Sequence, residues 1–149
     1  MQRIVLDTNC LLMSLPRISP YRIIWDMFLE SKFMLCVSTE IIEEYSEIIS
    51  KKTTSEIANN VIATILNAQN TELVTPYFRF NLIQSDFDDN KFVDCCITAN
   101  AQYIVSNDRH FDILKQIDFP HVNVISAKEF SEHLTLCLFQ KKRCRPMVN

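Results

Sequence analysis

The chain of 149 residues contains no glycine. Glycine adopts positive φ at the least cost, so turns here must be made by residues that carry a side chain, chiefly asparagine, aspartate, serine and proline. Dinucleotide-binding fingerprints, Walker A loops, kinase phosphate loops and the nucleophile elbow of hydrolases all need glycine geometry. These function classes are therefore excluded in their usual form, and any phosphate chemistry has to rest on side chains and metal ions.

Short apolar runs alternate with amphipathic stretches along the chain. Runs typical of buried strands lie at residues 3–7, 33–37, 72–75, 103–106 and 122–125. Helical periodicity is found at residues 8–14, 20–31, 38–51, 53–69, 90–101, 109–116 and from 126 onward. The predicted N-caps of three of these helices are Ser38, Thr53 and Ser126. This order predicts an α/β fold, a three-layer sandwich in which a short parallel sheet is flanked by helices.

The length predicts a single domain, which we expect to span residues 1–136 and to be followed by a basic C-terminal tail at 137–149. No apolar run approaches the roughly 20 residues of a membrane span, and the N-terminus lacks the pattern of a signal peptide. We therefore expect a cytoplasmic protein with no membrane partner. The six cysteines form no CxxC pair and lie mostly in apolar segments, so we expect reduced thiols.

Two carboxylates follow predicted strands directly or after a short turn. Asp7 ends the first strand, and Asp108 follows the strand at 103–106 after Asn107. In an open parallel sheet, ligands bind outside the carboxyl ends of the strands. Each acid alone has a simpler explanation as a turn or helix cap. Two acids at the same edge of one sheet favour a functional site.

Two further acids come from predicted helices. At 100° per residue, Glu44 lies on the border of the apolar face of the helix at 38–51. Asp89 falls near the centre of the apolar face of the following acid-rich segment, whereas Asp94 points away from it. The alternatives are that Glu44 extends into water and that Asp89 only caps its helix.

These placements bring four carboxylates toward one end of the sheet: Asp7, Glu44, Asp89 and Asp108. Such a cluster repels itself and raises pKa values unless cations neutralise it. Oxygen ligands suit one or two Mg²⁺ or Mn²⁺ ions, which activate water in phosphodiester hydrolysis. No zinc site is expected, because the three histidines are scattered along the chain at His110, His121 and His133.

The chain resembles the PIN-domain family of metal-dependent ribonucleases, and within it the VapC-like toxins of bacterial toxin–antitoxin pairs. The matching motifs are Asp7-Thr8-Asn9, Glu44-Tyr45, Asp86-x-x-Asp89-Asn90-Lys91-Phe92 and Val105-Ser106-Asn107-Asp108. The resemblance covers nearly the whole chain. Three positions depart from the family pattern, since Ser106 replaces the usual threonine, Asn107 a frequent glycine and Asp94 a frequent glutamate.

The resemblance implies an active endoribonuclease that cuts RNA with Mg²⁺ or Mn²⁺. It assigns metal binding and catalysis to Asp7, Glu44, Asp89 and Asp108. It places five further residues in the substrate-binding or supporting shell: Thr8, Asn9, Asp94, Ser106 and Arg109. The implied partners are single-stranded RNA, a cognate antitoxin and a second copy of the chain in a homodimer.

Two other functions stay open from the sequence. The first is a non-catalytic RNA- or protein-binding module that keeps the acids as a structural network. The second is a phosphatase with an aspartate nucleophile, which is disfavoured because Asn9 occupies the place of its second acid. Basic residues that would contact phosphates in a nuclease are Lys91, Arg109, Lys141, Lys142, Arg143 and Arg145. Aromatic residues able to stack on bases are Tyr21, Trp25, Phe78 and Phe80, although core or interface roles come first for them.

Overall fold

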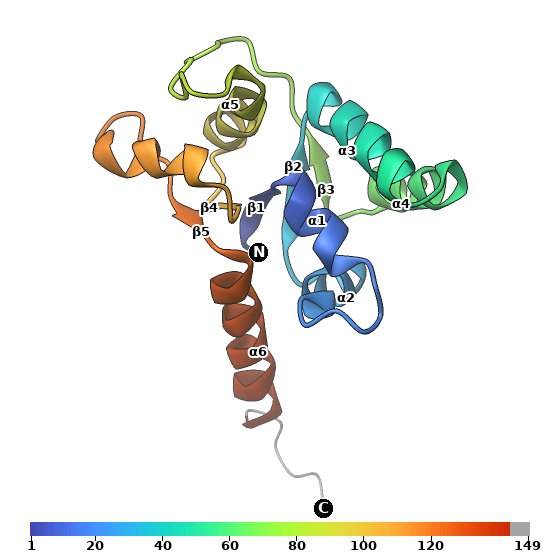
Figure 1. Cartoon of the computed structure of the whole chain (residues 1–149). Coiled ribbons are helices and arrows are strands. Elements are labelled where there is room, and N and C mark those ends of the chain that lie inside the picture. Colours follow the sequence, from blue (N-terminus) through green and yellow to red (C-terminus); the bar gives the residue numbers. More distant parts are fainter. Residues whose placement is uncertain (144–149) are drawn as a thin grey trace, which may run out of the picture.

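The computed structural model describes residues 1–143 and contains the predicted parallel sheet (Figure 1). All its strand pairs are parallel, and the strand order is β3-β2-β1-β4-β5. The strands are β1 (Arg3–Leu6), β2 (Met34–Val37), β3 (Thr71–Leu73), β4 (Tyr103–Val105) and β5 (Val124–Ile125). The five predicted strands are therefore confirmed, and each is shorter than its apolar run.

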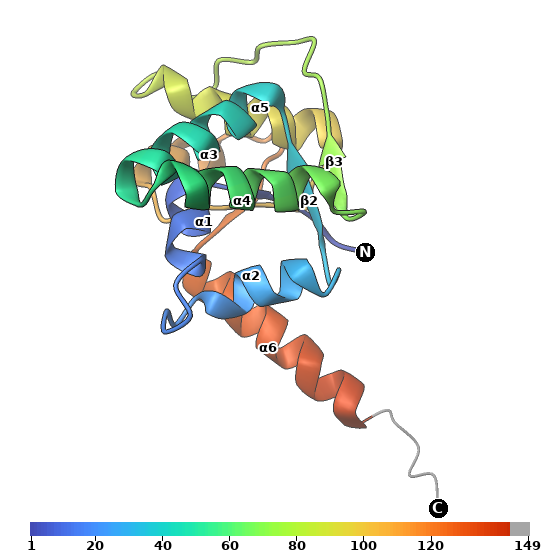
Figure 2. The ribbon, with the colours of Figure 1, turned by 90° about the vertical axis from the view of Figure 1, so that its right-hand side faces the viewer.

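Helices connect the strands. They are α1 (Thr8–Ser14), α2 (Arg22–Leu29), α3 (Thr39–Lys52), α4 (Ser55–Asn67), α5 (Asn90–Ala99) and α6 (Ala127–Arg143), with the 3₁₀ helices η1 (Phe87–Asp89) and η2 (Arg109–Gln116). Figure 2 shows α5 on one side of β1 and α2 with α6 on the other, as a three-layer sandwich requires. Within residues 1–143, no helix is both long enough and apolar enough to cross a membrane.

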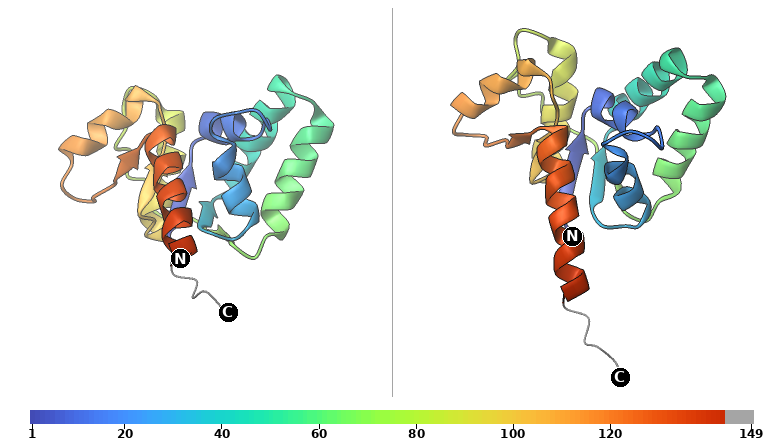
Figure 3. Two further views of the ribbon diagram at one scale, coloured as in Figure 1. Left: turned by 90° about the horizontal axis from the view of Figure 1, so that it is seen from below. Right: turned by 60° about the horizontal axis from the view of Figure 1, so that its bottom comes forward.

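A series of aromatic ring contacts packs α2 and α6 against the sheet. The ring centroids of Trp25 and Phe28 are 5.5 Å apart, and those of Phe28 and Phe33 are 6.1 Å apart. Phe33, next to β2, then meets Phe130 of α6 edge-on at 5.2 Å. Such pairs add to the hydrophobic stabilisation that burial of the rings already provides. Figure 3 shows that α6 extends past the sheet.

The strand order reverses beside β1. The chain moves from β1 to β2 and β3, and then returns through α5 to β4 on the opposite side of β1. In register, Leu6 lies beside Val105, and the Asp7 amide donates to the Val105 carbonyl at 3.0 Å. A reversal of this kind opens a crevice at the carboxyl ends of the two strands. The residues that follow β1 and β4 are therefore neighbours at the place where a ligand is expected.

Serine and asparagine take the positions that glycine commonly fills. The residues with positive φ are Ser31 (56°), Asn81 (50°) and Asn100 (51°) among those described. Asn107, which stands where relatives often have glycine, is not one of them. Its Oδ1 instead accepts a hydrogen bond from the Ala127 amide at 3.0 Å and so holds the start of α6.

One predicted N-cap differs from expectation. The N-cap of α4 is Thr54, which accepts from the Ile57 amide at 3.1 Å, and not Thr53. Because α3 continues to Lys52, the Thr53 hydroxyl donates to the Ile49 carbonyl at the end of that helix. The short helix predicted at 109–116 is confirmed, and it is a 3₁₀ helix.

The C-terminal tail is only partly described. Helix α6 runs through position 136 and ends at Arg143, so part of the expected tail is helical. Residues 144–149, which include Arg145, lie outside the described residues. The division of the chain at 136 stays a prediction.

The left-handed conformation at Asn100 predicts a stability effect. Replacing Asn100 by alanine should lower the free energy of unfolding by about 1 kcal/mol, because a Cβ-bearing residue without a local polar group is disfavoured there. Asn100→Gly should cost less than Asn100→Ala, because glycine adopts this conformation freely. Urea denaturation measures both. Asn67→Ala, on the exposed face of α4, is the control, and an equal loss in both alanine variants would contradict the explanation.

Candidate metal-binding site

Asp7 is a buried carboxylate at the end of β1, only 6% exposed. Its Oδ1 accepts from the Thr8 amide at 2.8 Å, which caps α1, and its Oδ2 accepts from Ser106 Oγ at 2.7 Å. Burial raises the pKa of Asp7 above its usual 3.8, the two hydrogen bonds oppose this shift, and the charges of Glu44 and Asp108 add to it. The hydrogen bonds thus fix the position of the side chain, while burial and the neighbouring negative charges destabilise its ionised form.

Ser106 links the two acids that follow β1 and β4. Its buried hydroxyl donates to Asp7 and accepts from the Asp108 amide at 3.0 Å. Asp108 in turn caps η2 by accepting from the His110 amide at 2.9 Å. Both hydrogen bonds are made by the hydroxyl group, which serine shares with the threonine that is usual at this position.

Glu44 reaches the same region from α3. It accepts a hydrogen bond from the Thr8 hydroxyl and forms an ion pair with Lys91 at 2.8 Å between Oε1 and Nζ. The next residue, Tyr45, is fully buried, and its hydroxyl donates to the Leu6 carbonyl at the end of β1. Both carboxylate oxygens of Glu44 therefore have protein partners, so the alternative that this side chain simply extends into water is wrong.

Asp89 is the most perturbed of the four predicted acids. Its side chain is 13% exposed, and burial, followed by the charges of Asp86, Asp108 and Asp7, raises its pKa to about 6. The alternative cap role belongs to Asp86, whose carboxylate accepts from the Asp88 amide at 3.1 Å. Asp89 makes no side-chain cap bond at the start of α5. Its carboxylate faces the other acids, as the helical periodicity predicts.

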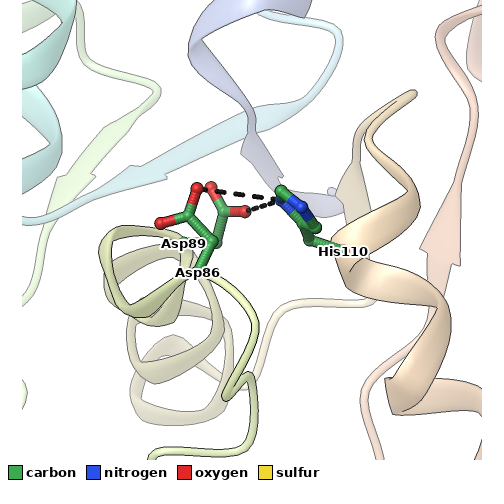
Figure 4. A group of neighbouring side chains, drawn as sticks. All are labelled: Asp86, Asp89 and His110. Atoms are coloured by element: carbon green, nitrogen blue, oxygen red, sulfur yellow. Dashed lines mark hydrogen bonds and ion pairs between the residues drawn. The ribbon is translucent and has the colours of Figure 1, made fainter.

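His110 joins this group, contrary to the expectation of scattered histidines. Its Nδ1 lies 3.2 Å from Asp89 Oδ2 and 3.7 Å from Asp86 Oδ2 (Figure 4). The same nitrogen lies 3.2 Å from Asp108 Oδ1. Desolvation lowers its pKa, but the charge of Asp108 and the hydrogen bond to Asp89 outweigh this effect and raise the pKa above 6.5. The available signal in the sequence was its position, two residues after an acid that follows a strand.

Aromatic packing holds the two sides of this group together. Phe92 of α5 and Phe111 of η2 are fully buried and meet nearly perpendicularly, with ring centroids 6.4 Å apart. Each lies within three residues of a titratable group of the site, Asp89 and His110. The packing therefore fixes the separation between the start of α5 and the start of η2.

The prediction that Asp94 points outward, into solvent, is wrong. Asp94 is buried, because residues 74–86 cross over that face of α5, and its Oδ1 accepts from the Phe80 amide at 3.1 Å. Burial raises its pKa. Asp94 lines a different pocket from Asp7 and Asp108, and its hydrogen bond is with this loop.

The remaining predicted residues differ in how close they come to the acids. Asn9 lines a pocket of about 200 Å³ together with Asp7 and Asp108. Thr8 is buried and contacts Glu44 as described above. Arg109 is exposed at the first position of η2 and forms no ion pair within residues 1–143.

The donor set fits a divalent cation. Burial and the charges of Glu44 and Asp108 raise the pKa of Asp7, and burial and the charges of Asp86, Asp108 and Asp7 raise that of Asp89, as expected of carboxylates that lack enough neighbouring positive charge. Ligand atoms of Asp86, Asp89 and His110 all lie within 4.8 Å of one another. Oxygen-rich groups of this kind bind Mg²⁺ and Mn²⁺, and an imidazole nitrogen is compatible with Mn²⁺.

Comparison with known proteins identifies the family. The PIN domain family matches residues 3–110. Among solved structures, the fold is similar to that of a chain in the crystal structure of VapBC2 from Rickettsia felis bound to a DNA fragment from their promoter. The TM-score is 0.56 and the identity 18%, over 84% of this chain and 98% of that chain. No curated protein matches. The chain belongs to the PIN domain family, as its motifs predict.

The hydroxyl of Ser106 predicts a matched pair of variants. Ser106→Ala should lower the free energy of unfolding at pH 7 by about 2 kcal/mol, because it removes a hydrogen bond to a buried charge. Ser106→Thr keeps the hydroxyl and should cost clearly less than Ser106→Ala. Urea denaturation in EDTA distinguishes them, and the assignment fails if threonine is as damaging as alanine.

The raised pKa of Asp89 predicts a pH effect in the metal-free protein. Because the folded-state pKa of about 6 exceeds the usual 3.8, the stability that this group contributes is full below pH 3.8 and is lost as pH rises through 6. Asp89→Asn should therefore become more stable than wild type across this window, by about 1 to 2 kcal/mol.

Thermal and urea unfolding in EDTA at several pH values measure this difference. Asp112→Asn, an exposed carboxylate in η2, is the control and should not reproduce it. A wild-type protein that gains stability relative to Asp89→Asn as pH rises would contradict the electrostatic account.

Proposed function

We propose that the protein is a metal-dependent endoribonuclease that hydrolyses RNA phosphodiester bonds. The observation that carries the proposal is the gathering of Asp7, Asp89 and Asp108 at the strand-order reversal, with pKa values of Asp7 and Asp89 raised by burial and by neighbouring charge. Membership of the PIN domain family supports it. Nuclease chemistry of this class needs a place for cations beside a phosphate, and this edge of the sheet offers one.

Four residues would hold one or two Mg²⁺ or Mn²⁺ ions: Asp7, Glu44, Asp89 and Asp108. Ions bound there supply an activated water and stabilise the leaving oxygen of a phosphodiester. Ser106 holds the carboxylate of Asp7 in a single orientation, and Thr8 does the same for Glu44. Lys91 balances part of the charge of Glu44 and would lie close to a substrate phosphate.

We also propose that the protein is the toxin of a toxin–antitoxin pair, that it acts in the cytoplasm on single-stranded RNA, and that it forms homodimers. The similar fold in the VapBC2 complex supports a cognate antitoxin as partner. The apolar residues around Tyr21 to Phe28 and Ile57 to Leu66 are the candidates for the dimer surface. Of these, Trp25 and Phe28 are part of the core. Ile57 and Leu66 on α4 remain exposed and are the better candidates for contact with a second copy.

The alternative of a non-catalytic binding module is less well supported. A structural network of acids is normally balanced by cations or hydrogen-bond donors, because an uncompensated buried charge is costly. Here Asp7 is buried and Asp89 partly buried beside other negative charges, and the pKa of both is raised in spite of the hydrogen bonds from Thr8 and Ser106 to Asp7 and from His110 to Asp89. Such an arrangement opposes stability and is typical of functional sites.

The proposal predicts RNA cleavage that depends on one buried acid. Purified wild-type protein should cut labelled single-stranded RNA with Mn²⁺ or Mg²⁺ and not with EDTA. Asp7→Asn should reduce the rate by at least about a hundredfold while leaving the protein folded, because the geometry of the site stays but a ligand charge is lost. Glu47→Gln is the control, since Glu47 is exposed and pairs with Lys51.

Gel analysis of the products and circular dichroism of each variant complete the test. Equal cleavage by wild type and Asp7→Asn would point to a contaminating nuclease. Binding of RNA without cleavage under every metal condition would contradict the enzyme proposal and favour the non-catalytic binding module.

A further inference from the structure

The loop between β3 and η1 displays aromatic side chains to solvent. Tyr77 is 87% exposed and Phe78 is 75% exposed, and Arg79 separates them from the partly exposed Phe80. Figure 1 shows this loop passing over the top of the molecule from β3 to α5. Neighbouring aromatic residues exposed to this extent gain no stability from burial and form an apolar surface that is accessible to a ligand.

The loop is anchored on both sides of these residues. Before them, the Val74 amide donates to the Val37 carbonyl at 2.8 Å and continues the pairing of β3 with β2. After them, the Phe80 amide is bound by Asp94, and the amide and carbonyl of buried Ile83 are both bound by the side chain of Asn90, at 2.9 and 2.8 Å. Tyr77, Phe78 and Arg79 therefore project from a segment whose two ends are held by the sheet and by α5.

A pocket of about 270 Å³ lies beneath this segment. It is bounded by the first turn of α3, by residues 74–76 and by α5, and its charged lining residues are Glu40, Arg79, Lys91 and Asp94. Arg79 pairs with Glu40 at 2.9 Å, and its side chain is 70% exposed. An exposed pair of this kind contributes little to stability, so Arg79 can exchange Glu40 for another anion at low cost.

The pocket adjoins the acid group. Lys91 lines it and also forms the ion pair with Glu44, while Glu40 lies one helical turn before Glu44 on α3. A polymer whose phosphate lies at the acids can therefore place its neighbouring residue at this pocket. Tyr77 and Phe78 lie between Pro76 and Arg79, which both line the pocket, so the aromatic residues adjoin it.

We propose that Tyr77, Phe78 and Arg79 form a nucleotide-binding subsite, in which the two rings stack on unpaired bases of the RNA beside the cut and Arg79 binds a backbone phosphate. The inference rests on the proposed function, because it takes RNA to be the substrate. Stacking on aromatic rings requires bases that are not paired, so the subsite selects single-stranded RNA. It also accounts for Asp94 and Asn90, which position the loop.

The chemistry of the surface favours nucleic acid over a protein partner. An arginine among aromatic residues provides both a phosphate contact and stacking faces, and every base offers a face for stacking. The groove between α2 and α6, by contrast, is lined mainly by aliphatic and neutral side chains such as Ile23 and Leu136. That groove is the surface typical of protein contacts.

Binding measured without cleavage tests the subsite. In EDTA, fluorescence anisotropy should show wild-type protein binding a labelled, short single-stranded oligouridylate. The double variant Tyr77→Ala/Phe78→Ala should weaken binding by about tenfold or more, since each stacked base depends on its ring. Tyr77→Phe/Phe78→Tyr keeps both rings and should bind like wild type. Phe139→Ala, an exposed aromatic residue on α6, is the matched control.

Arg79→Ala provides a separate readout. It should weaken binding and reduce the slope of log affinity against log salt concentration by about one, because one phosphate contact is lost. In addition, Phe78→Trp should give tryptophan fluorescence that the oligouridylate quenches, whereas the native Trp25 is buried and should respond little. A purely structural role for the loop would produce neither effect.

The outcomes separate this inference from the proposed function. Loss of RNA binding in the double alanine variant supports the subsite. If in addition no metal ion allows cleavage by wild type, only the enzyme proposal fails. If wild type cleaves RNA and the double variant binds and cleaves it equally well, the subsite is wrong and the enzyme proposal stands. The inference also fails if wild type does not bind the oligouridylate, or if the double variant alters only self-association.

Discussion

The hydrogen bond from Ser106 to Asp7 is the contact on which the arrangement of the site depends. It joins the ends of β1 and β4 at the point where the strand order reverses, and the same hydroxyl accepts from the Asp108 amide. On the other side of β1, the Tyr45 hydroxyl binds the Leu6 carbonyl and brings Glu44 of α3 to the same edge. Backbone topology and two hydroxyl groups thus place acids from distant parts of the chain side by side.

Placing these acids together opposes folding. Burial and mutual repulsion raise the pKa of Asp7 and Asp89, so at neutral pH the folded protein holds charges that the unfolded chain would leave in water. The aromatic contacts of the core, such as Phe92 with Phe111 and Phe33 with Phe130, offset this cost. A bound divalent cation would remove the repulsion, which links the stability of the protein to the function that we propose.

Sequence patterns predicted the strands, the sheet type and the direction of Asp89. Strand ends and helical periodicity are determined by neighbouring residues in the chain, and packing of the segments does not change them. They did not predict what depends on contacts between segments. His110 reaches the acids only because η2 folds back against α5, and Asp94 is buried only because the loop after β3 crosses its helix. The exposure of Tyr77 and Phe78 was equally hidden, since an aromatic residue in a loop is compatible with either core or surface.

A crystal structure of the protein soaked in Mn²⁺, recorded with anomalous scattering, tests most directly whether these acids bind a metal ion. We predict a manganese peak at the carboxyl ends of β1 and β4, with carboxylate oxygens of Asp7 and Asp108 among its ligands, and its loss in crystals of Asp7→Asn. Full Mn²⁺ soaking without density at these carboxylates, or a peak unaffected by Asp7→Asn, would contradict the claim that this group of acids is a metal-binding site.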